Sequence, residues 1–167
     1  MSGPAPAHHA IAALERQVPG EVVVVTQNVD GLHQAAGSTR VIELHGSLGT
    51  MRCVGAGHSL AVGDADWGDD GVPRCPECGE PCRPGVVLFG EMLPRSAWQA
   101  GGQAIRDAAT VVAAGTSASV QPAASLVSYA ATEHAVRIWV NPRDGPPDEG
   151  WQWLAGTADE ELARLAW

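Results

Sequence analysis

The chain has 167 residues, of which 45% are hydrophobic, and it carries a formal net charge of −9 with a pI near 4.9. This length supports one domain with a real core, and the acidic balance argues against a nucleic-acid-binding surface, which needs a basic patch. No stretch reaches the ~18 apolar residues of a membrane helix, and the start lacks a signal-peptide pattern. We therefore expect a cytoplasmic protein that binds neither nucleic acid nor a membrane.

The first elements in chain order are a helix and two strands. Residues 8–18 have the apolar spacing of a short amphipathic helix. Val22–Val25 is a run of β-branched residues, typical of a strand that is buried on both faces of a parallel sheet. Val41–Leu44 is predicted to form a second strand, which ends at His45.

Residues 51–84 differ in composition from the rest, because they are rich in Gly, Pro, Asp and Cys and poor in large aliphatic residues. Such a segment cannot build a core unaided, so we predict a small insert that a metal ion holds together. The chain then divides into a module at 51–84 and an α/β domain formed by 1–50 and 85–167.

After residue 84, helices and strands alternate again. Helices are predicted over 97–109, 122–133 and 158–167, and strands over 110–114 and 136–140. This alternation predicts an α/β fold with a mostly parallel sheet, in which ligands bind beyond the carboxyl ends of the strands.

Three polar clusters fall at such strand ends, namely Thr26–Asp30, Gly115–Ser117 and Asn141. Their shared placement indicates a nucleotide-sized site. The amide and carboxylate groups of the first cluster can bind ribose hydroxyls or a carboxamide. The alternative is an Asx-type turn, in which Asp30 caps the next helix.

His45 and the cysteines are the remaining candidates for chemistry. A histidine at the end of a strand, followed by Gly46, can act as a general base, although a lone histidine is more often structural. Cys75 and Cys78 have the CxxC spacing of half a zinc site, and Cys53 lies 22 residues before Cys75. The alternative is a set of unrelated buried cysteines.

Five strings strengthen these interpretations when they are taken together: TQNVDGLH, ELHG, CPECG, RPGVVLFGEMLP and GTSASVQPAA. They occur in the order and approximate spacing of the sirtuins, and they extend from about residue 6 to the end. The chain therefore resembles the sirtuin family of NAD-dependent protein deacylases, in its bacterial form.

The resemblance implies a Rossmann-like domain with an inserted zinc module, and NAD and zinc as cofactors. It implies that His45 is the catalytic base. The carbonyl oxygen of an acyl-lysine attacks the anomeric carbon of NAD and releases nicotinamide. The histidine then deprotonates a ribose hydroxyl, and the products are free lysine and O-acyl-ADP-ribose. The expected partner is an acyl-lysine protein or peptide.

The same resemblance implies roles for other residues. Residues expected to contact NAD are Gln27, Asn28, Val29, Asp30, Gly115, Thr116, Ser117, Asn141 and Ala158. Residues expected to bind substrate, by pairing with its backbone as an added strand, are Val87, Phe89, Gly90 and Glu91. Phe89 would wall the acyl-lysine tunnel; the alternative for this only Phe is core packing.

Two departures from the family pattern matter. The usual second zinc cysteine falls at Ala56, so the fourth ligand after Cys53, Cys75 and Cys78 is either His58 or Cys82, and loss of zinc is a further alternative. The family's first strand and its glycine-rich loop are not found in these residues. That strand is central in the doubly wound order, so we expect two half-sheets and little or no turnover from these 167 residues.

Two other functions stay open from the sequence. One is a truncated, inactive sirtuin remnant that acts only as an interaction module. The other is a plain zinc-ribbon module, against which the α/β pattern and the ELHG and GTS strings count.

Overall fold

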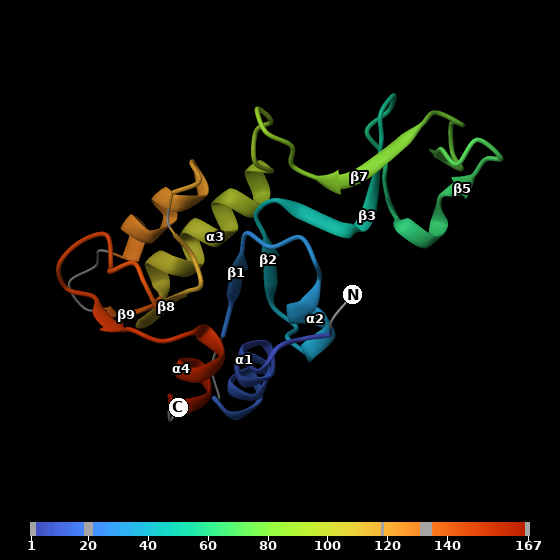
Figure 1. Ribbon diagram of the computed structural model, residues 1–167. Helices are drawn as coiled ribbons and strands as arrows, with labels where there is room; N and C mark the ends of the chain where they lie inside the picture. Colours follow the sequence, from blue (N-terminus) through green and yellow to red (C-terminus); the bar gives the residue numbers. More distant parts are fainter. Residues whose placement is uncertain (1–2, 19–21, 118, 131–134, 166–167) are drawn as a thin grey trace. The chain divides into compact units, whose positions relative to one another are not determined.

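The structure of the protein is a computed structural model that describes residues 3–18, 22–117, 119–130 and 135–165. It divides into two compact units (Figure 1). Unit 1 comprises Met1–Val25, Leu32–Ile42 and Arg95–Trp167, and unit 2 comprises Thr26–Gly31 and Glu43–Pro94.

The elements of unit 1 are helices around parallel strands, and two of those strands continue into unit 2. They are α1 (Pro6–Gln17), β1 (Val24–Thr26), α2 (Leu32–Ala36), β2 (Val41–Glu43), α3 (Arg95–Asp107), β8 (Thr110–Ala114), the 3₁₀ helix η2 (Ala123–Ala130), β9 (Val136–Val140), β10 (Gln152–Leu154) and α4 (Ala158–Arg164). None of the helices in the described ranges is both long enough and apolar enough to cross a membrane.

The main sheet of unit 1 has the order β10-β9-β8, and both of its ladders are parallel. The central strand β9 is buried on both faces, as a parallel strand between helices must be. On one face Ile138 and Val140 pack with Ala7 of α1 and Leu162 of α4. On the other face Trp139 packs edge-on against Trp151, with 5.8 Å between ring centroids.

Helices α1 and α4 lie side by side (Figure 1) and are joined at their first turns. Pro6 stands in the first turn of α1, where its missing N–H costs nothing. The Ala7 N–H donates to Asp159 Oδ1 of α4 at 2.9 Å. This bond ties the two helix starts together on the same face of the sheet.

β1 and β2 form a second, separate sheet. Val24 N–H donates to Arg40 O and Leu44 N–H donates to Thr26 O, each at 2.9 Å. Residue numbers increase in the same direction along β1 and β2, so the two strands are parallel. The predicted parallel α/β fold is confirmed, and within the described ranges its strands lie in two sheets, of which β1 and β8 are edge strands.

Unit 2 is built on antiparallel strands of the order β4-β3-β7, with a small β5-β6 hairpin. Its elements are β3 (Gly46–Cys53), β4 (Ser59–Ala61), the 3₁₀ helix η1 (Val62–Asp64), β5 (Asp66–Trp67), β6 (Pro73–Arg74) and β7 (Cys82–Val86). Its core is small and rich in sulfur: Met51, Cys53, Ala65, Cys75 and Cys82, with Leu60 packed against them. Because β3 pairs with β7 at both ends, with a register shift between Ser47 and Met51, unit 2 extends past 51–84 on both sides.

The local predictions hold best where apolar runs are continuous. The strands expected at 110–114 and 136–140 are confirmed, while the first predicted strand is shifted to Val24–Thr26. The α-helix predicted over 122–133 is wrong in type, because Ala123–Ala130 is a 3₁₀ helix; residues 131–134 lie outside the described ranges. Ser125 and Ser128 hydroxyls donate to carbonyls three residues earlier, which competes with α-helical bonding.

Candidate active site and metal centre

His45 stands in the tight turn between β2 and β3. Leu44 anchors the turn, since its side chain is buried and its N–H bonds Thr26 O. Gly46 follows with φ +73°, and a Cβ there would lie 2.0 Å from the Gly85 carbonyl oxygen. Only glycine fits, so the chain can turn sharply and leave the half-buried His45 ring at the strand end.

The His45 ring is held in one orientation by the polar loop that follows β1. Its Nδ1 lies 3.0 Å from the Gln27 carbonyl oxygen. A carbonyl oxygen can only accept, so Nδ1 carries the hydrogen. In the neutral ring Nε2 then keeps its lone pair, which is the state that a general base requires.

The loop itself is fixed at two further points. Asn28 N–H donates to Thr26 Oγ1 at 3.0 Å, and Leu48 N–H of β3 donates to Val29 O at 2.8 Å. The side chains of Asn28 and Asp30 are exposed. The structure therefore brings the predicted cofactor residues of this loop next to the predicted base.

The predicted substrate segment lies against His45 as well. Val87 N–H donates to the His45 carbonyl oxygen at 2.8 Å. A hollow of about 540 Å³ lies along this segment, lined by Arg52, Gly85, Val86, Val87, Glu91, Met92 and Pro94. Phe89 is fully exposed, so it is no core residue.

The other predicted cofactor residues lie in unit 1, at the ends of two neighbouring strands. Asn141 after β9 donates from its amide to Thr116 O at 3.0 Å, and its oxygen accepts from the Arg143 and Asp144 N–H groups. Asn141 is 7% exposed, so its side chain ties the Gly115–Ser117 loop to the turn after β9. Ala158 is the half-buried first residue of α4.

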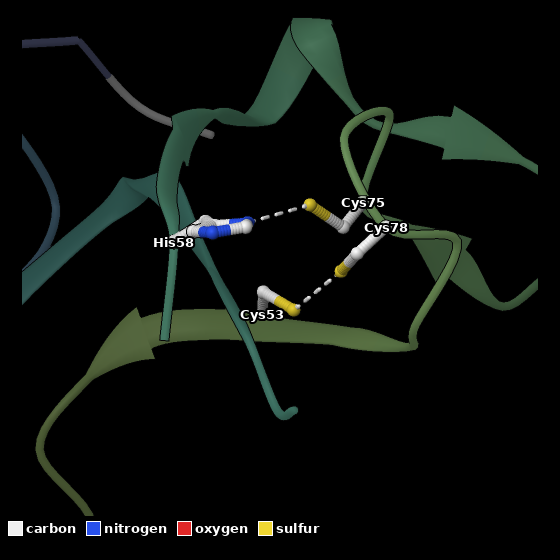
Figure 2. Close-up of side chains that lie close together, drawn as sticks. All are labelled: Cys53, His58, Cys75 and Cys78. Carbon is white, nitrogen blue, oxygen red and sulfur yellow. Dashed lines mark hydrogen bonds between the residues drawn. The ribbon is translucent and has the colours of Figure 1, made fainter. Parts of the chain in front are cut away.

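Four side chains of unit 2 point at a common centre (Figure 2). Cys53 ends β3 and His58 precedes β4, while Cys75 and Cys78 lie on the turn after β6. The chain turns tightly after Cys53 and after Cys75, because Gly57 N–H donates to Cys53 O at 3.1 Å and Gly79 N–H donates to Cys75 O at 2.8 Å. All four ligand atoms lie within 4.8 Å of one another.

The spacing of these atoms fits a tetrahedral zinc ion. Zinc bonds of about 2.3 Å to sulfur and 2.0 Å to nitrogen give tetrahedron edges of roughly 3.5–3.8 Å. Cys53 Sγ lies 3.5 Å from Cys78 Sγ, and His58 Nδ1 lies 3.4 Å from Cys75 Sγ. Three thiols and one imidazole are a donor set that zinc prefers, and the cysteines are not joined as disulfides.

Neighbouring groups shift the pKa values of Cys53 and Cys78 in opposite directions. The Ala56 backbone N–H holds the pKa of Cys53 below its ordinary value. The Glu80 N–H lowers the pKa of Cys78, but the hydrogen bond to Cys53 and burial raise it to about 11. A divalent cation at the centre would offset this repulsion between thiolates.

Cys82 belongs to the same buried core but not to the group of four. It lies across from Cys53 in the β3–β7 ladder. Its Sγ contacts the Glu80 carbonyl oxygen at 4.0 Å, and burial raises the pKa of the thiol. The geometry therefore favours His58 over Cys82 as the fourth donor.

Comparison with known proteins decides the family. A model of the Sir2 family matches residues 1–122, which is more than half of the chain. The chain belongs to the Sir2 family. The resemblance to sirtuins that the five sequence strings indicate is thereby confirmed.

Curated relatives of this Sir2 chain are named NAD-dependent protein deacylases or deacetylases. The NAD-dependent protein deacylase of a Thermus thermophilus strain is 44% identical over 146 residues, which is 86% of this chain and 56% of the relative. The NAD-dependent protein deacetylase 1 of Pyrobaculum aerophilum is 41% identical over 165 residues, or 97% and 64% of the two chains. The Sir2 chain thus spans less than two thirds of the length of these relatives.

Solved structures show the same likeness. A Sir2 homologue in complex with NAD superposes with a TM-score of 0.84 at 41% identity, covering 96% of this chain and 62% of that one. A Sir2 bound to an acetylated peptide gives a TM-score of 0.85 at 33% identity, covering 97% and 69%.

Sequence reasoning missed two arginines that lie beside the predicted substrate segment. Arg52 lines the hollow beside Val87, and Arg83 forms an ion pair with Glu91 at 2.7 Å. No spacing rule marks either of them, because β3 and β7 place them through antiparallel pairing, in which Arg52 and Arg83 stand opposite each other.

Proposed function

We propose that this chain serves the NAD-dependent removal of acyl groups from protein lysines, with His45 as the general base. One observation carries the proposal: the Gln27 carbonyl fixes the Nδ1 hydrogen of His45 and leaves Nε2 able to accept a proton. The relatives named NAD-dependent protein deacylase and deacetylase support the same chemistry.

NAD supplies an anomeric carbon that can lose nicotinamide and receive the acyl oxygen. The chain's own residues bind and orient NAD and the acyl-lysine. Nε2 of His45 takes the proton of a ribose hydroxyl, and the amides of Gln27 and Asn28 with Val29 and Asp30 hold the nicotinamide and ribose part. Gly115, Thr116, Ser117, Asn141 and Ala158 are assigned to the remaining nucleotide contacts, as the family resemblance implies.

Val87, Phe89, Gly90 and Glu91 are assigned to the peptide. The turn they form is joined to His45 by the Val87 N–H bond, so a lysine held there enters beside the base. Phe89 projects fully from the turn and is placed to cover the apolar stem of an acyl-lysine.

The experiment is nicotinamide release from NAD with an acetyl-lysine peptide, using the longest reading frame that contains these 167 residues. His45→Ala should lower the rate by at least about 100-fold, since general bases contribute about 10²–10⁴. His9→Ala is the matched control, because His9 is an exposed histidine on α1. Equal rates in the two variants would contradict the proposal.

The 167 residues by themselves are a second arm of this experiment. We expect little or no turnover from them, because β1 and β8 lack a common neighbouring strand within the described ranges. Robust turnover would show that the sheet does not need that strand for the reaction.

We further propose that Cys53, His58, Cys75 and Cys78 bind one structural zinc ion. The ion would join the two turns of unit 2 and take no part in the reaction. The cytoplasm, where thiols stay reduced, suits such a site.

Metal content measured by mass spectrometry tests the ligand set. Cys75→Ser and Cys78→Ser should lose zinc, and His58→Ala should bind it more weakly, whereas His58→Cys should retain it. Cys82→Ser is the matched control and should keep a full equivalent. Zinc lost from Cys82→Ser but kept by His58→Ala would make Cys82 the fourth ligand.

A further inference from the structure

The turn after β7 is closed by one charged side-chain pair. Arg83 Nη2 donates to Glu91 Oε1 at 2.7 Å, and Glu91 Oε2 accepts from Leu88 N–H at 3.0 Å. Glu91 N–H donates in turn to Leu88 O at 3.0 Å. These bonds, which we name the Arg83–Glu91 buckle, close residues 88–91 on themselves.

The second arm of the Arg83 guanidinium reaches the strand. Its Nη1 donates to Val86 O at 2.9 Å. The side chains of Arg83 and Glu91 are 26% and 38% exposed, so the pair is partly shielded from water. A planar guanidinium can hold a carboxylate and a carbonyl at once, which an ammonium group on a flexible stem does less well.

The buckle uses a particular set of backbone groups. Both backbone groups of Val87 face the turn before β3, because Val87 N–H donates to His45 O. Successive residues of an extended chain point to opposite edges, so Val86 and Leu88 face the other edge. The buckle satisfies Val86 C=O and both backbone groups of Leu88.

Other backbone groups of the same turn remain available. Across the part of the chain that the structure describes, the backbone groups of Phe89 and Gly90 make no hydrogen bond. Gly90 has φ +88° and Phe89 is fully exposed, so the turn presents these groups outward. An added peptide strand needs such unpaired groups on a turn that is already ordered.

We propose that Arg83 and Glu91 are positioning residues, which hold the 87–91 turn in the shape that accepts an acyl-lysine peptide. This inference rests on the proposed function, because the peptide is the ligand it concerns. The buckle occupies the groups that would otherwise bind water or mispair, and it leaves the backbone groups of Phe89 and Gly90 for the peptide. Without the buckle the turn becomes ordered only when the peptide binds. The apparent peptide affinity is then reduced in proportion to the fraction of molecules whose turn already has the binding conformation.

The test is binding of a fluorescein-labelled peptide with one acetyl-lysine, followed by fluorescence anisotropy. Glu91→Gln keeps the size of the side chain but weakens both bonds, and we expect affinity to fall about three- to tenfold. Arg83→Lys should give an intermediate loss. The double variant Arg83→Ala, Glu91→Gln should bind no more weakly than Arg83→Ala, because both changes open the same buckle.

The chain offers a closely matched control in Asp70. That carboxylate also bridges an arginine and a backbone N–H, since it accepts from Arg74 at 2.8 Å and from Val72 N–H at 3.0 Å. Asp70→Asn should leave peptide affinity unchanged. Equal affinity of Glu91→Gln and Asp70→Asn, with both equal to the unaltered protein, would overturn the proposal.

Two readouts separate positioning from general loss of structure. Chymotrypsin should cleave after Phe89 faster in Glu91→Gln than in Asp70→Asn, while zinc content stays the same in both. In the active protein, KM for peptide should rise with kcat unchanged; a fall in kcat at constant KM would contradict the inference. No peptide binding by the unaltered protein would instead overturn the proposed function, and this role of the buckle with it.

Discussion

The two units hold their cores together by different means. Unit 1 buries aliphatic and aromatic side chains against a parallel sheet, with Trp139 and Val140 each 1% exposed. Unit 2 buries three cysteines in a core that otherwise contains only Met51, Leu60 and Ala65. Apolar area stabilises in proportion to its size, so unit 1 can depend on burial while unit 2 needs a further source of stability.

Four ligand atoms within 4.8 Å supply that source in unit 2 if a metal ion joins them. A structural zinc ion contributes folding free energy directly, because its site does not exist in the unfolded chain. The chain therefore combines a unit stabilised by burial of apolar side chains with a unit for which we propose stabilisation by a metal ion, so chelators and cavity-forming substitutions should affect different units.

Removal of metal should have the largest effect, and only on unit 2. Zinc binding to such sites is worth about 10 kcal/mol, which exceeds what so small a core can replace. After treatment with a chelator, or in Cys75→Ser, amide hydrogen exchange should become fast in β3 and β7. Exchange in β8 and β9 should stay slow.

The control for this prediction is Cys82→Ser, which keeps all four proposed ligands and should keep slow exchange in β3 and β7 with zinc present. Equal loss of protection in both units would show that they fold as one cooperative unit.

The reverse experiment is a cavity in unit 1. Trp139→Ala removes a ring that is 1% exposed and that donates from Nε1 to Asp144 O at 2.8 Å. We expect a loss of about 3–5 kcal/mol in the free energy of unfolding of unit 1, measured with urea, and no change in zinc content.

Trp67→Ala is the matched control, because Trp67 lies in unit 2 and is 58% exposed. It should leave the stability of unit 1 unchanged. A Trp139→Ala protein that loses zinc as well would show that the metal site depends on the parallel sheet.

The same contrast explains what the sequence predicts well. Strands β8 and β9 are readable because each is a continuous apolar run whose burial decides its structure. β3, GSLGTMRC, alternates between polar and apolar residues only over its last four residues, and β7, CRPGV, contains Pro84 and Gly85, which are unusual inside a strand. Each strand is completed by pairing with the other across about 30 residues of sequence, so local pattern alone does not predict their full extent.

The candidate site divides in a similar way. His45 and the cysteines are chosen by residue type and spacing, which local chemistry determines. The tautomer of His45 cannot be predicted in this way, because it depends on the direction of the Gln27 carbonyl, which lies 18 residues earlier in the chain. The choice between His58 and Cys82 also needs the turn geometry, since sequence distance allows both.

The smallest effect concerns helix α4, which unit 1 secures by a local cap. Thr157 Oγ1 accepts from Glu160 N–H, and the Glu160 carboxylate accepts from the Thr157 hydroxyl at 2.9 Å. The Thr157 hydroxyl, its N–H and Arg164 hold the pKa of Glu160 below its ordinary value. A carboxylate whose pKa is lower in the folded chain stabilises the fold at pH values above its unfolded pKa, and this stability is lost as the pH falls through the lowered pKa.

Thr157→Ala should therefore lower the free energy of unfolding by about 1 kcal/mol near neutral pH, and by less at pH values below the lowered pKa, as measured by urea unfolding. Ser128→Ala is the control, since its hydroxyl donates to the Ser125 carbonyl, which does not titrate, so its effect should not change with pH. A Thr157→Ala loss that stays constant as the pH falls would mean that Glu160 titrates alike in folded and unfolded chains.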